Sequence, residues 1–161
     1  MSDEPEIRKM KESDVGAVMD MIHRLKLLNQ EFDPTFQVAE PPADEVKESL
    51  REAIRQEKQY IMLVVEAEGK AVGVVKADIH NRIYYLPRQE ARITEFYVMP
   101  EFRRKMLGKK LISQLYSELG RRGITMVSAE FPSLNLIALG FYKGMGYRDI
   151  VSVYGRHLGD E

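Results

Sequence analysis

Apolar residues recur along the chain with two spacings, which predict helices in some segments and strands in others. In the first third, a short run at 6–10 predicts a strand. Two amphipathic helices follow: one begins at Ser13 or Asp14 as its N-cap and ends near residue 29, and the other follows a proline-containing loop at 30–42. Their apolar faces consist of Val15, Val18, Ile22 and Leu25 in the first helix, and of Val46, Leu50, Ala53 and Ile54 in the second.

The rest of the chain alternates between strand-like and helical segments. Glu68-Gly69-Lys70 predicts a tight hairpin turn, and 81–89 predicts a longer turn. The predicted strands are 60–65, 71–75, 91–99, 126–131 and, as one strand or a pair, 147–154; the predicted helices are 107–122 and 135–143. The order β-α-α-β-β-β-α-β-α-β predicts an α/β fold, in which a mixed sheet carries helices on both faces.

Composition restricts the classes of function. The 161 residues suit a single domain at 1–161, and the net charge of −1 gives no general reason to expect nucleic acid or an acidic membrane surface. The chain has no cysteine, and its three histidines are scattered without the spacing of metal ligands. No apolar signal region or membrane-length run is present. These features predict a cytoplasmic protein that uses no metal.

The segment at 93–111 joins a predicted strand, a basic loop and the start of a helix. Five of the eight residues at 103–110 are Lys or Arg, and none is acidic. Cations near a helix N-terminus are unfavourable by roughly 0.3–1 kcal/mol each, whereas the free N–H groups there bind anions. The pattern therefore indicates either a phosphate site or a solvated basic face, and charge alone does not separate the two.

Longer motifs favour the phosphate site. The P-loop and dinucleotide-binding patterns are absent. Instead, the stretch EFYVMPEFRRKMLGKKL at 95–111 resembles the acyl-CoA-binding motif of the GNAT N-acetyltransferase superfamily, [QR]-x-x-G-x-[GA] after a strand. A second signature of that superfamily, N-x-x-A-x-x-F-Y-x-x-x-G-[FY], is matched at Asn135, Ala138, Phe141, Tyr142, Gly146 and Tyr147. The motifs have the superfamily's order and spacing, and the resemblance covers nearly the whole chain.

The resemblance implies a mixed, mostly antiparallel GNAT-like sheet and transfer of an acetyl group from acetyl-CoA to a primary amine, by direct attack in a ternary complex. One position departs from the pattern: Met106 stands where the family has the first glycine of its phosphate loop, whereas Gly108 keeps the second. The side chain of Met106 must therefore point away from the donor, or the loop must shift. The residues implied to bind acetyl-CoA are Phe96, Tyr97, Val98, Arg103, Arg104, Lys105, Met106, Leu107, Gly108, Lys109, Asn135 and Tyr142.

Two side chains are candidates for proton transfer. Tyr142 matches the family's usual general acid, although the residues alone are also consistent with a core aromatic at the end of a short helix. Glu95 is the candidate base, because in an unbulged strand it shares a face with Ile93 and Tyr97, whose apolar surroundings would raise the pKa of a carboxyl. The alternatives for Glu95 are an ordinary polar position or a water relay. Asn135 is equally consistent with a helix cap.

The sequence says less about the amine acceptor than about the donor. Residues 30–52 contain seven acidic side chains against two basic ones, which suits a cationic small-molecule or peptide amine or, equally, a solvated helix face. A homodimer is left open. Two other classes compete with the enzyme: a non-catalytic acyl-CoA-binding module of the same fold, and a nucleic-acid protein using 103–110. Neutral net charge and the lack of aromatics within 103–110 argue against the latter, and no nucleic-acid or membrane partner is expected.

Overall fold

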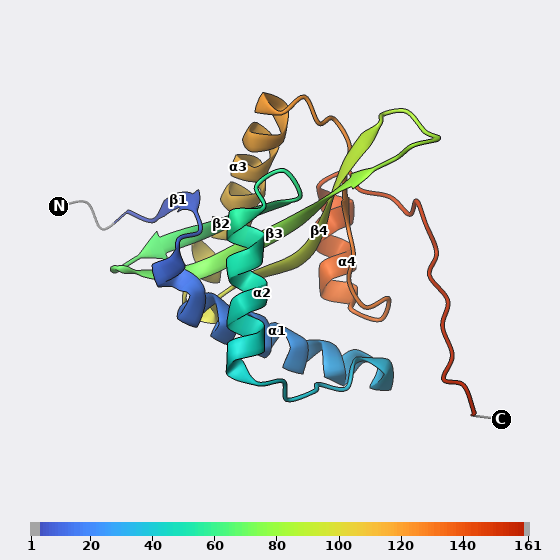
Figure 1. The fold of residues 1–161 in the computed structure, drawn as a ribbon, viewed down its shortest axis with the longest axis horizontal. Helices are drawn as coiled ribbons and strands as arrows, with labels where there is room; N and C mark the ends of the chain where they lie inside the picture. The colour runs from blue at the N-terminus through green and yellow to red at the C-terminus, as the bar shows by residue number, and fades with distance from the viewer. Residues whose placement is uncertain (1–3, 160–161) are drawn as a thin grey trace.

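The computed structural model describes residues 4–159, except for the side chains of Arg104 and Lys105. A five-stranded sheet with the order β1-β2-β3-β4-β5 forms its centre, as Figure 1 shows. Neighbouring strands are antiparallel from β1 to β4, and β5 runs parallel to β4. The strands are β1 (Glu6–Lys9), β2 (Tyr60–Ala67), β3 (Lys70–Asn81), β4 (Gln89–Val98) and β5 (Val127–Ala129).

Helices cover both faces of this sheet. The helices are α1 (Val15–Phe32), α2 (Ala43–Arg55), α3 (Leu107–Arg121) and α4 (Leu136–Gly144), with short 3-10 turns η1 (Glu12–Asp14), η2 (Pro34–Phe36) and η3 (Pro100–Lys105). Helices α1 and α2 pack on one face, and α3 and α4 pack on the other. The predicted fold class, a mixed and mostly antiparallel sheet with helices on both faces, is confirmed.

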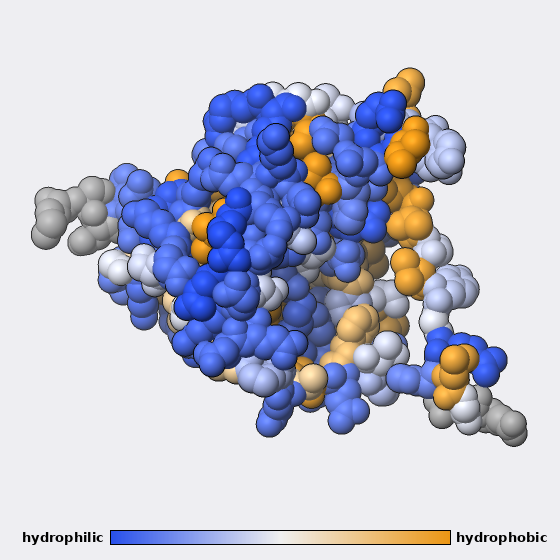
Figure 2. Space-filling view, in the orientation of Figure 1, coloured by the Kyte–Doolittle hydropathy of each residue, from blue (hydrophilic) through white to orange (hydrophobic). Residues whose placement is uncertain are grey.

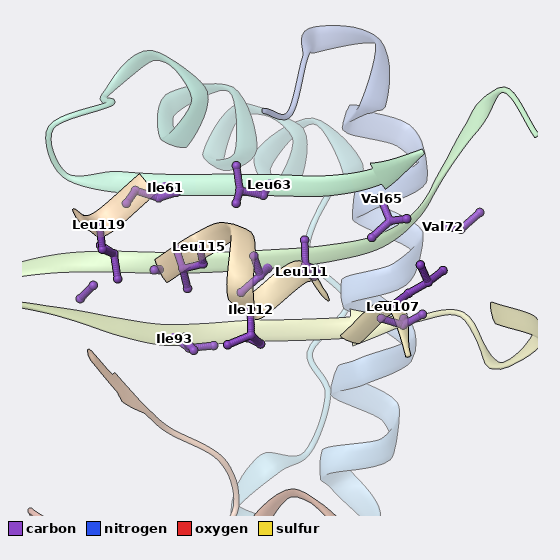
Figure 3. Packing of buried hydrophobic residues seen from close by; sticks show 14 of the residues in the cluster. Ile61, Leu63, Val65, Val72, Ile93, Leu107, Leu111, Ile112, Leu115 and Leu119 are labelled. Atoms are coloured by element: carbon purple, nitrogen blue, oxygen red, sulfur yellow. The ribbon is translucent and has the colours of Figure 1, made fainter. Parts of the chain in front are cut away.

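Two apolar cores result, one on each face. The core under α3 places Leu107, Leu111 and Leu115 against strand residues such as Leu63 and Ile93, as Figure 3 shows. The core under α1 and α2 is built from the opposite side chains of the same strands and includes Val18 and Tyr97. Consecutive apolar residues in β2 and β3 are therefore buried on both sides, which explains why these strands read as continuous apolar runs rather than as alternating ones.

The hairpin between β2 and β3 has the predicted tight turn. Glu68 and Gly69 both have positive φ, at 54° and 80°. A two-residue turn of this kind matches the right-handed twist of the strands that it joins. Glycine adopts this backbone without a steric penalty, which makes the Glu68-Gly69 pair a specific turn signal.

The predicted last strand, 147–154, is wrong. No part of residues 147–157 forms a strand, and this segment runs along the outside of the domain, as Figure 1 shows. The β-rich composition misleads because this segment pairs with no described strand, and the edge strand β5 is only three residues long. Val153 and Tyr154 are 89% and 93% exposed. Figure 2 shows hydrophobic residues along this segment and at the tip of the β3–β4 hairpin.

Smaller differences concern element ends. Helix α1 continues to Phe32 instead of ending near residue 29, and β5 is shorter than the predicted 126–131. Across residues 4–159, no helix has both the length and the apolar content that crossing a membrane requires.

Candidate active site

Strand β4 contains a bulge at Thr94. Glu95 lies opposite Lys76 of β3, and Ile93 lies opposite the next residue, Ala77, so Thr94 has no partner in the ladder. An extra residue of this kind changes which face the following side chains occupy. Ile93 therefore packs in the core under α3, whereas Tyr97 packs under α1 and α2. Glu95 shares a face with Tyr97, as expected, but not with Ile93; the bulge makes that part of the prediction wrong.

The pairing of strands β4 and β5 ends at this bulge. Their pairing covers only Ala91–Ile93 against Val127–Ala129, and the last bond runs from the Glu130 N–H to the Ile93 carbonyl at 3.0 Å. Before the separation, the Ser128 hydroxyl donates to Glu90 at 2.7 Å and ties the strands together. Beyond it, within the described part of the chain, β4 has a strand neighbour only on the β3 side. The hydrogen-bond ladder of the sheet therefore has an opening on the β5 side of residues 95–98, where no described strand pairs with β4.

Backbone donors face this opening. The Met99 N–H donates to the Val72 carbonyl of β3 at 2.8 Å. The Val98 carbonyl belongs to the same trans peptide and therefore points away from β3. In an antiparallel strand the N–H and C=O of one residue point to the same side, and this side alternates from one residue to the next. The amides of Phe96 and Val98 consequently point away from β3, whereas that of Tyr97 points toward it. Of the three amides expected to contact the donor, those of Phe96 and Val98 have the suitable direction.

Arg103 is attached to β4. Its Nε donates to the Val98 carbonyl at 2.8 Å, and its guanidinium lies 5.3 Å from the centre of the Tyr97 ring. The arginine expected to bind phosphate thus also anchors η3 to the strand that borders the opening. The side chains of Arg104 and Lys105, two further predicted phosphate ligands, lie outside the described part of the structure.

The start of α3 explains both phosphate-loop positions. Met106 is the residue before the helix and has a φ of 56°, the left-handed conformation that glycine adopts readily. The residue is 59% exposed and lines an open depression of about 370 Å³ together with Lys109 and Lys110. Leu107 is buried in the core, so only its backbone can reach a ligand. Gly108 faces Phe96: a β-carbon on it would lie 3.1 Å from the Phe96 ring.

Tyr142 lies in an aromatic cluster on the α3–α4 side of the sheet. Its ring stacks on Phe131 at 5.4 Å and meets Phe141 and Tyr147 edge-on at 5.2 and 5.1 Å. Burial raises the pKa of the Tyr142 phenol, with a smaller contribution from Tyr116. The phenol is therefore protonated at neutral pH, as a hydrogen-bond donor must be.

Asn135 serves as the cap of α4. Its Oδ1 accepts from the Ala138 N–H at 3.0 Å, which satisfies one of the free donors at the helix start. This is the helix-cap alternative left open by the sequence. A side chain used in this way has its oxygen engaged, and a ligand contact would have to come from its amide nitrogen.

Glu95 lies on the other face of the sheet, toward α1. Both of its carboxylate oxygens accept from the Lys26 ammonium, at 2.5 and 2.8 Å. Burial raises the pKa of the Glu95 carboxyl, and Lys26 opposes this rise. Sequence reasoning did not identify Lys26. Its position four residues after Ile22, on the apolar side of α1, is the one signal that it points toward the sheet.

Three of the seven acidic residues at 30–52 have local partners. Asp33 accepts from the Thr35 N–H at 2.8 Å and starts η2. Glu48 and Glu52 both pair with Arg55 at 2.8 Å on exposed surface. Figure 2 shows a broadly hydrophilic face on this side of the domain. These contacts favour the solvated helix face over an acidic wall for the acceptor.

Comparison with known proteins identifies the family. The model of the acetyltransferase (GNAT) family matches residues 25–147, and the chain belongs to this family. An uncharacterized N-acetyltransferase of Methanocaldococcus jannaschii is 33% identical over 92 residues. That match covers 57% of this chain, and the chain spans only 41% of the length of that curated relative.

Solved structures share the fold. The glucosamine-6-phosphate N-acetyltransferase of Arabidopsis thaliana has a TM-score of 0.72 at 19% identity, covering 96% of this chain and 99% of its own. An aminoglycoside N-acetyltransferase in complex with CoA has a TM-score of 0.75 at 17% identity, covering 99% and 98%. At these identities the likeness establishes the fold alone.

Proposed function

We propose that this protein is an acetyl-CoA-dependent N-acetyltransferase that moves the acetyl group to a primary amine by direct attack within a ternary complex. The observation that carries the proposal is the opening between β4 and β5. Two backbone N–H groups point into it, and Tyr142 and Glu95 lie on opposite faces of the sheet that surrounds it. Acyl transfer needs oxyanion donors, a proton acceptor for the ammonium and a proton donor for the thiolate, and the proposal assigns these roles to the two amides, Glu95 and Tyr142.

Acetyl-CoA as donor is supported by the start of α3. The free N–H groups of this helix and the nearby Lys109 offer partners for the pyrophosphate. The N–H groups of Phe96 and Val98 would donate to the thioester carbonyl and to the pantetheine arm. Bound acetyl-CoA supplies an acetyl group already activated as a thioester, so no metal is required. The residues proposed to contact it remain those of the two motifs. Tyr97, whose own amide points toward β3, would contribute only by holding Phe96 and Val98 in position, and Asn135 would contact the donor through its amide nitrogen.

Proton transfer is assigned to the two buried side chains. Glu95 would take a proton from the acceptor ammonium, either directly or through one water, because its carboxylate is the group that already holds an ammonium in the structure. Tyr142 would donate to the departing sulfur. Its raised pKa keeps the phenol protonated at neutral pH, so a hydrogen bond from it to the thiolate is its proposed contribution.

The acceptor is proposed to be a small-molecule or peptide amine. Two of the proteins that share the fold are described as acting on glucosamine-6-phosphate and on aminoglycosides, which makes amino sugars a reasonable first set. A single domain at 1–161, a cytoplasmic location and a homodimer stay predictions. The exposed apolar segment after α4 is the surface that such a dimer would cover.

Thiol release tests the proposal. The protein is incubated with acetyl-CoA and a panel of amino sugars, aminoglycosides, polyamines and peptides, and free CoA is followed against a blank without amine. Amine-dependent release, with acetylated amine confirmed by mass spectrometry, supports the enzyme. Tight CoA binding without transfer to any amine would instead favour the alternative, a non-catalytic acyl-CoA-binding module.

A further inference from the structure

Lys26 of α1 occupies the place where an acceptor ammonium would be expected. Its Nζ lies 2.5 and 2.8 Å from the two oxygens of Glu95, a residue 69 positions later in the chain. The Lys26 side chain is 42% exposed, whereas that of Glu95 is only 15% exposed. The lysine therefore reaches from the surface of α1 toward a largely buried carboxylate on β4.

The neighbouring lysine makes a useful contrast. Lys76 lies directly opposite Glu95 in the β3–β4 ladder. Its ammonium nevertheless bonds to Asp78 at 2.6 Å and lies 4.7 Å from the centre of the Tyr60 ring. Two lysines thus approach the same region, and the one that bonds the candidate base comes from α1.

The position of Glu95 on β4 relates this contact to the opening. Phe96 and Val98, whose amides point away from β3, follow Glu95 directly on the strand. Residues in a strand advance by roughly 3.4 Å each, so the proposed thioester site begins within a few ångströms of the Glu95 backbone. An amine held by the Glu95 carboxylate is therefore separated from those amides by about the length of one glutamate side chain, and its attack on the acyl group requires that side chain to turn toward them.

We propose that Lys26 is a site of self-acetylation, an inference that rests on the acetyl-CoA-dependent transfer proposed above. The Lys26 ammonium loses one proton to Glu95 and from there to water. The neutral amine then attacks the thioester carbonyl carbon, a C–N bond forms, and the C–S bond breaks. The second amine proton ends on the departing sulfur, so the products are an acetamide, CoA thiol and one proton released to solvent.

Acetylation changes the site that produced it. The acetamide carries no charge, so Glu95 loses its ammonium partner. Before modification, the Lys26 ammonium competes with any diffusing amine for the same carboxylate. Afterwards that competition ends, and the carboxylate is left for an external acceptor.

Isotope labelling tests the proposal. The purified protein is incubated with acetyl-CoA carrying a ¹³C-labelled acetyl group, which separates new modification from any acquired during expression. Because an acetylated lysine resists trypsin, labelled Lys26 appears in the peptide that spans 25–47. We expect Lys26 to be labelled at least about tenfold faster than Lys76 or the exposed Lys58, since a positioned base accelerates proton transfer by this much or more. The rate constant should not depend on protein concentration.

Three controls make the result decisive. Excess unlabelled CoA should suppress labelling of Lys26 but not background labelling of Lys58. Glu95→Gln should slow Lys26 selectively, and Lys26→Arg should remove the labelled peptide while keeping the charge. Equal labelling of Lys26 in native and urea-denatured protein, or a rate that rises with protein concentration, would overturn the proposal.

The amine panel separates this inference from the function on which it rests. If an external amine is acetylated while Lys26 is labelled no faster than Lys58, self-acetylation is wrong and the transferase stands. If no amine and no lysine is acetylated above background, both are wrong.

Discussion

Gly108 at the start of α3 lies against the ring of Phe96 on β4, so closely that a β-carbon would come within 3.1 Å of the ring. Phe96 in turn stacks on Phe141 of α4 at 5.4 Å. The absent side chain of Gly108 thus sets how near the proposed phosphate loop can approach the strand whose amides face the opening. Contacts this short force a neighbour to move.

Gly108→Ala should therefore weaken CoA binding, because the Phe96 ring must shift or α3 must retreat from β4. Gly120→Ala is the matched control in the same helix, since nothing lies within 4 Å of a β-carbon there. Alanine at Gly120 should raise stability by about 0.5–1 kcal/mol and leave CoA affinity unchanged. Calorimetric titration with CoA and thermal unfolding of both variants check this. Equal CoA affinities in the two variants would contradict it.

Most of the fold could be predicted from the sequence, but only part of the candidate site could, and the reasons are physical. Periodicity located the helices and strands because burial on one or two faces controls residue type along each of them. It failed at 147–154, where β-rich residues have no strand to pair with. The bulge at Thr94 has no signature in side-chain type. The prediction that Ile93 and Glu95 share a face, which assumed an unbulged strand, was therefore wrong. The ion pair between Lys26 and Glu95 joins distant segments and could not be read from local pattern.

Met106→Gly is expected to increase CoA affinity. Met106 has a φ of 56°, which costs a non-glycine residue roughly 1–2 kcal/mol. Glycine removes that strain but adds about 0.4–1 kcal/mol of unfolded-state entropy, so stability should change by less than about 1 kcal/mol. The gain in affinity arises because the backbone can then approach the pyrophosphate. Met106→Ala, which shortens the side chain but keeps the strain, is the control; an equal gain with alanine and with glycine would show that bulk rather than conformation limits binding.

Tyr142→Phe should lower turnover by about 10²-fold or more while leaving acetyl-CoA binding nearly intact, because a positioned donor to the leaving group is lost. Tyr147→Phe is the control within the same aromatic cluster. It removes the 2.6 Å hydrogen bond between the Tyr147 and Tyr116 hydroxyls and should affect stability more than turnover. Steady-state kinetics with chemistry rate-limiting distinguish the two. A Tyr142→Phe enzyme within twofold of wild type would exclude the acid role.

Glu95→Gln should remove the acidic limb of the rate–pH profile. Activity requires the ionised carboxylate, and burial raises the pKa of Glu95. In the wild type, the limb should therefore lie at higher pH than an ordinary glutamate would give. Rate–pH profiles of both proteins with a saturating amine provide the measurement. An acidic limb that persists unchanged in the Gln variant would assign the base to another group or to a water chain.

The same substitution has a stability consequence. The pKa of Glu95 is raised in the folded protein, so the folded state holds this proton more tightly than the unfolded state does. Its contribution to stability consequently falls as pH rises from the unfolded pKa through the folded pKa. Glutamine does not titrate, so Glu95→Gln should gain stability relative to wild type as pH rises through that interval. Thermal midpoints measured across the interval check the sign, and a relative loss toward higher pH would contradict it.

CoA should stabilise the protein more than pantetheine does, because the phosphates are expected to bind at the start of α3. Ligand at 100 times its dissociation constant stabilises a native state by roughly 2.7 kcal/mol, and each kcal/mol shifts the midpoint of a domain of this size by about 2–4 °C. A shift of several degrees in the thermal midpoint is therefore expected with CoA.

Lys109→Gln should shrink that shift, whereas Lys58→Gln, at an exposed site on another part of the surface, should not. Arg103→Gln should in addition lower the midpoint of the ligand-free protein, since it breaks the bond to the Val98 carbonyl. Equal shifts with CoA and pantetheine would mean that this loop does not hold the pyrophosphate.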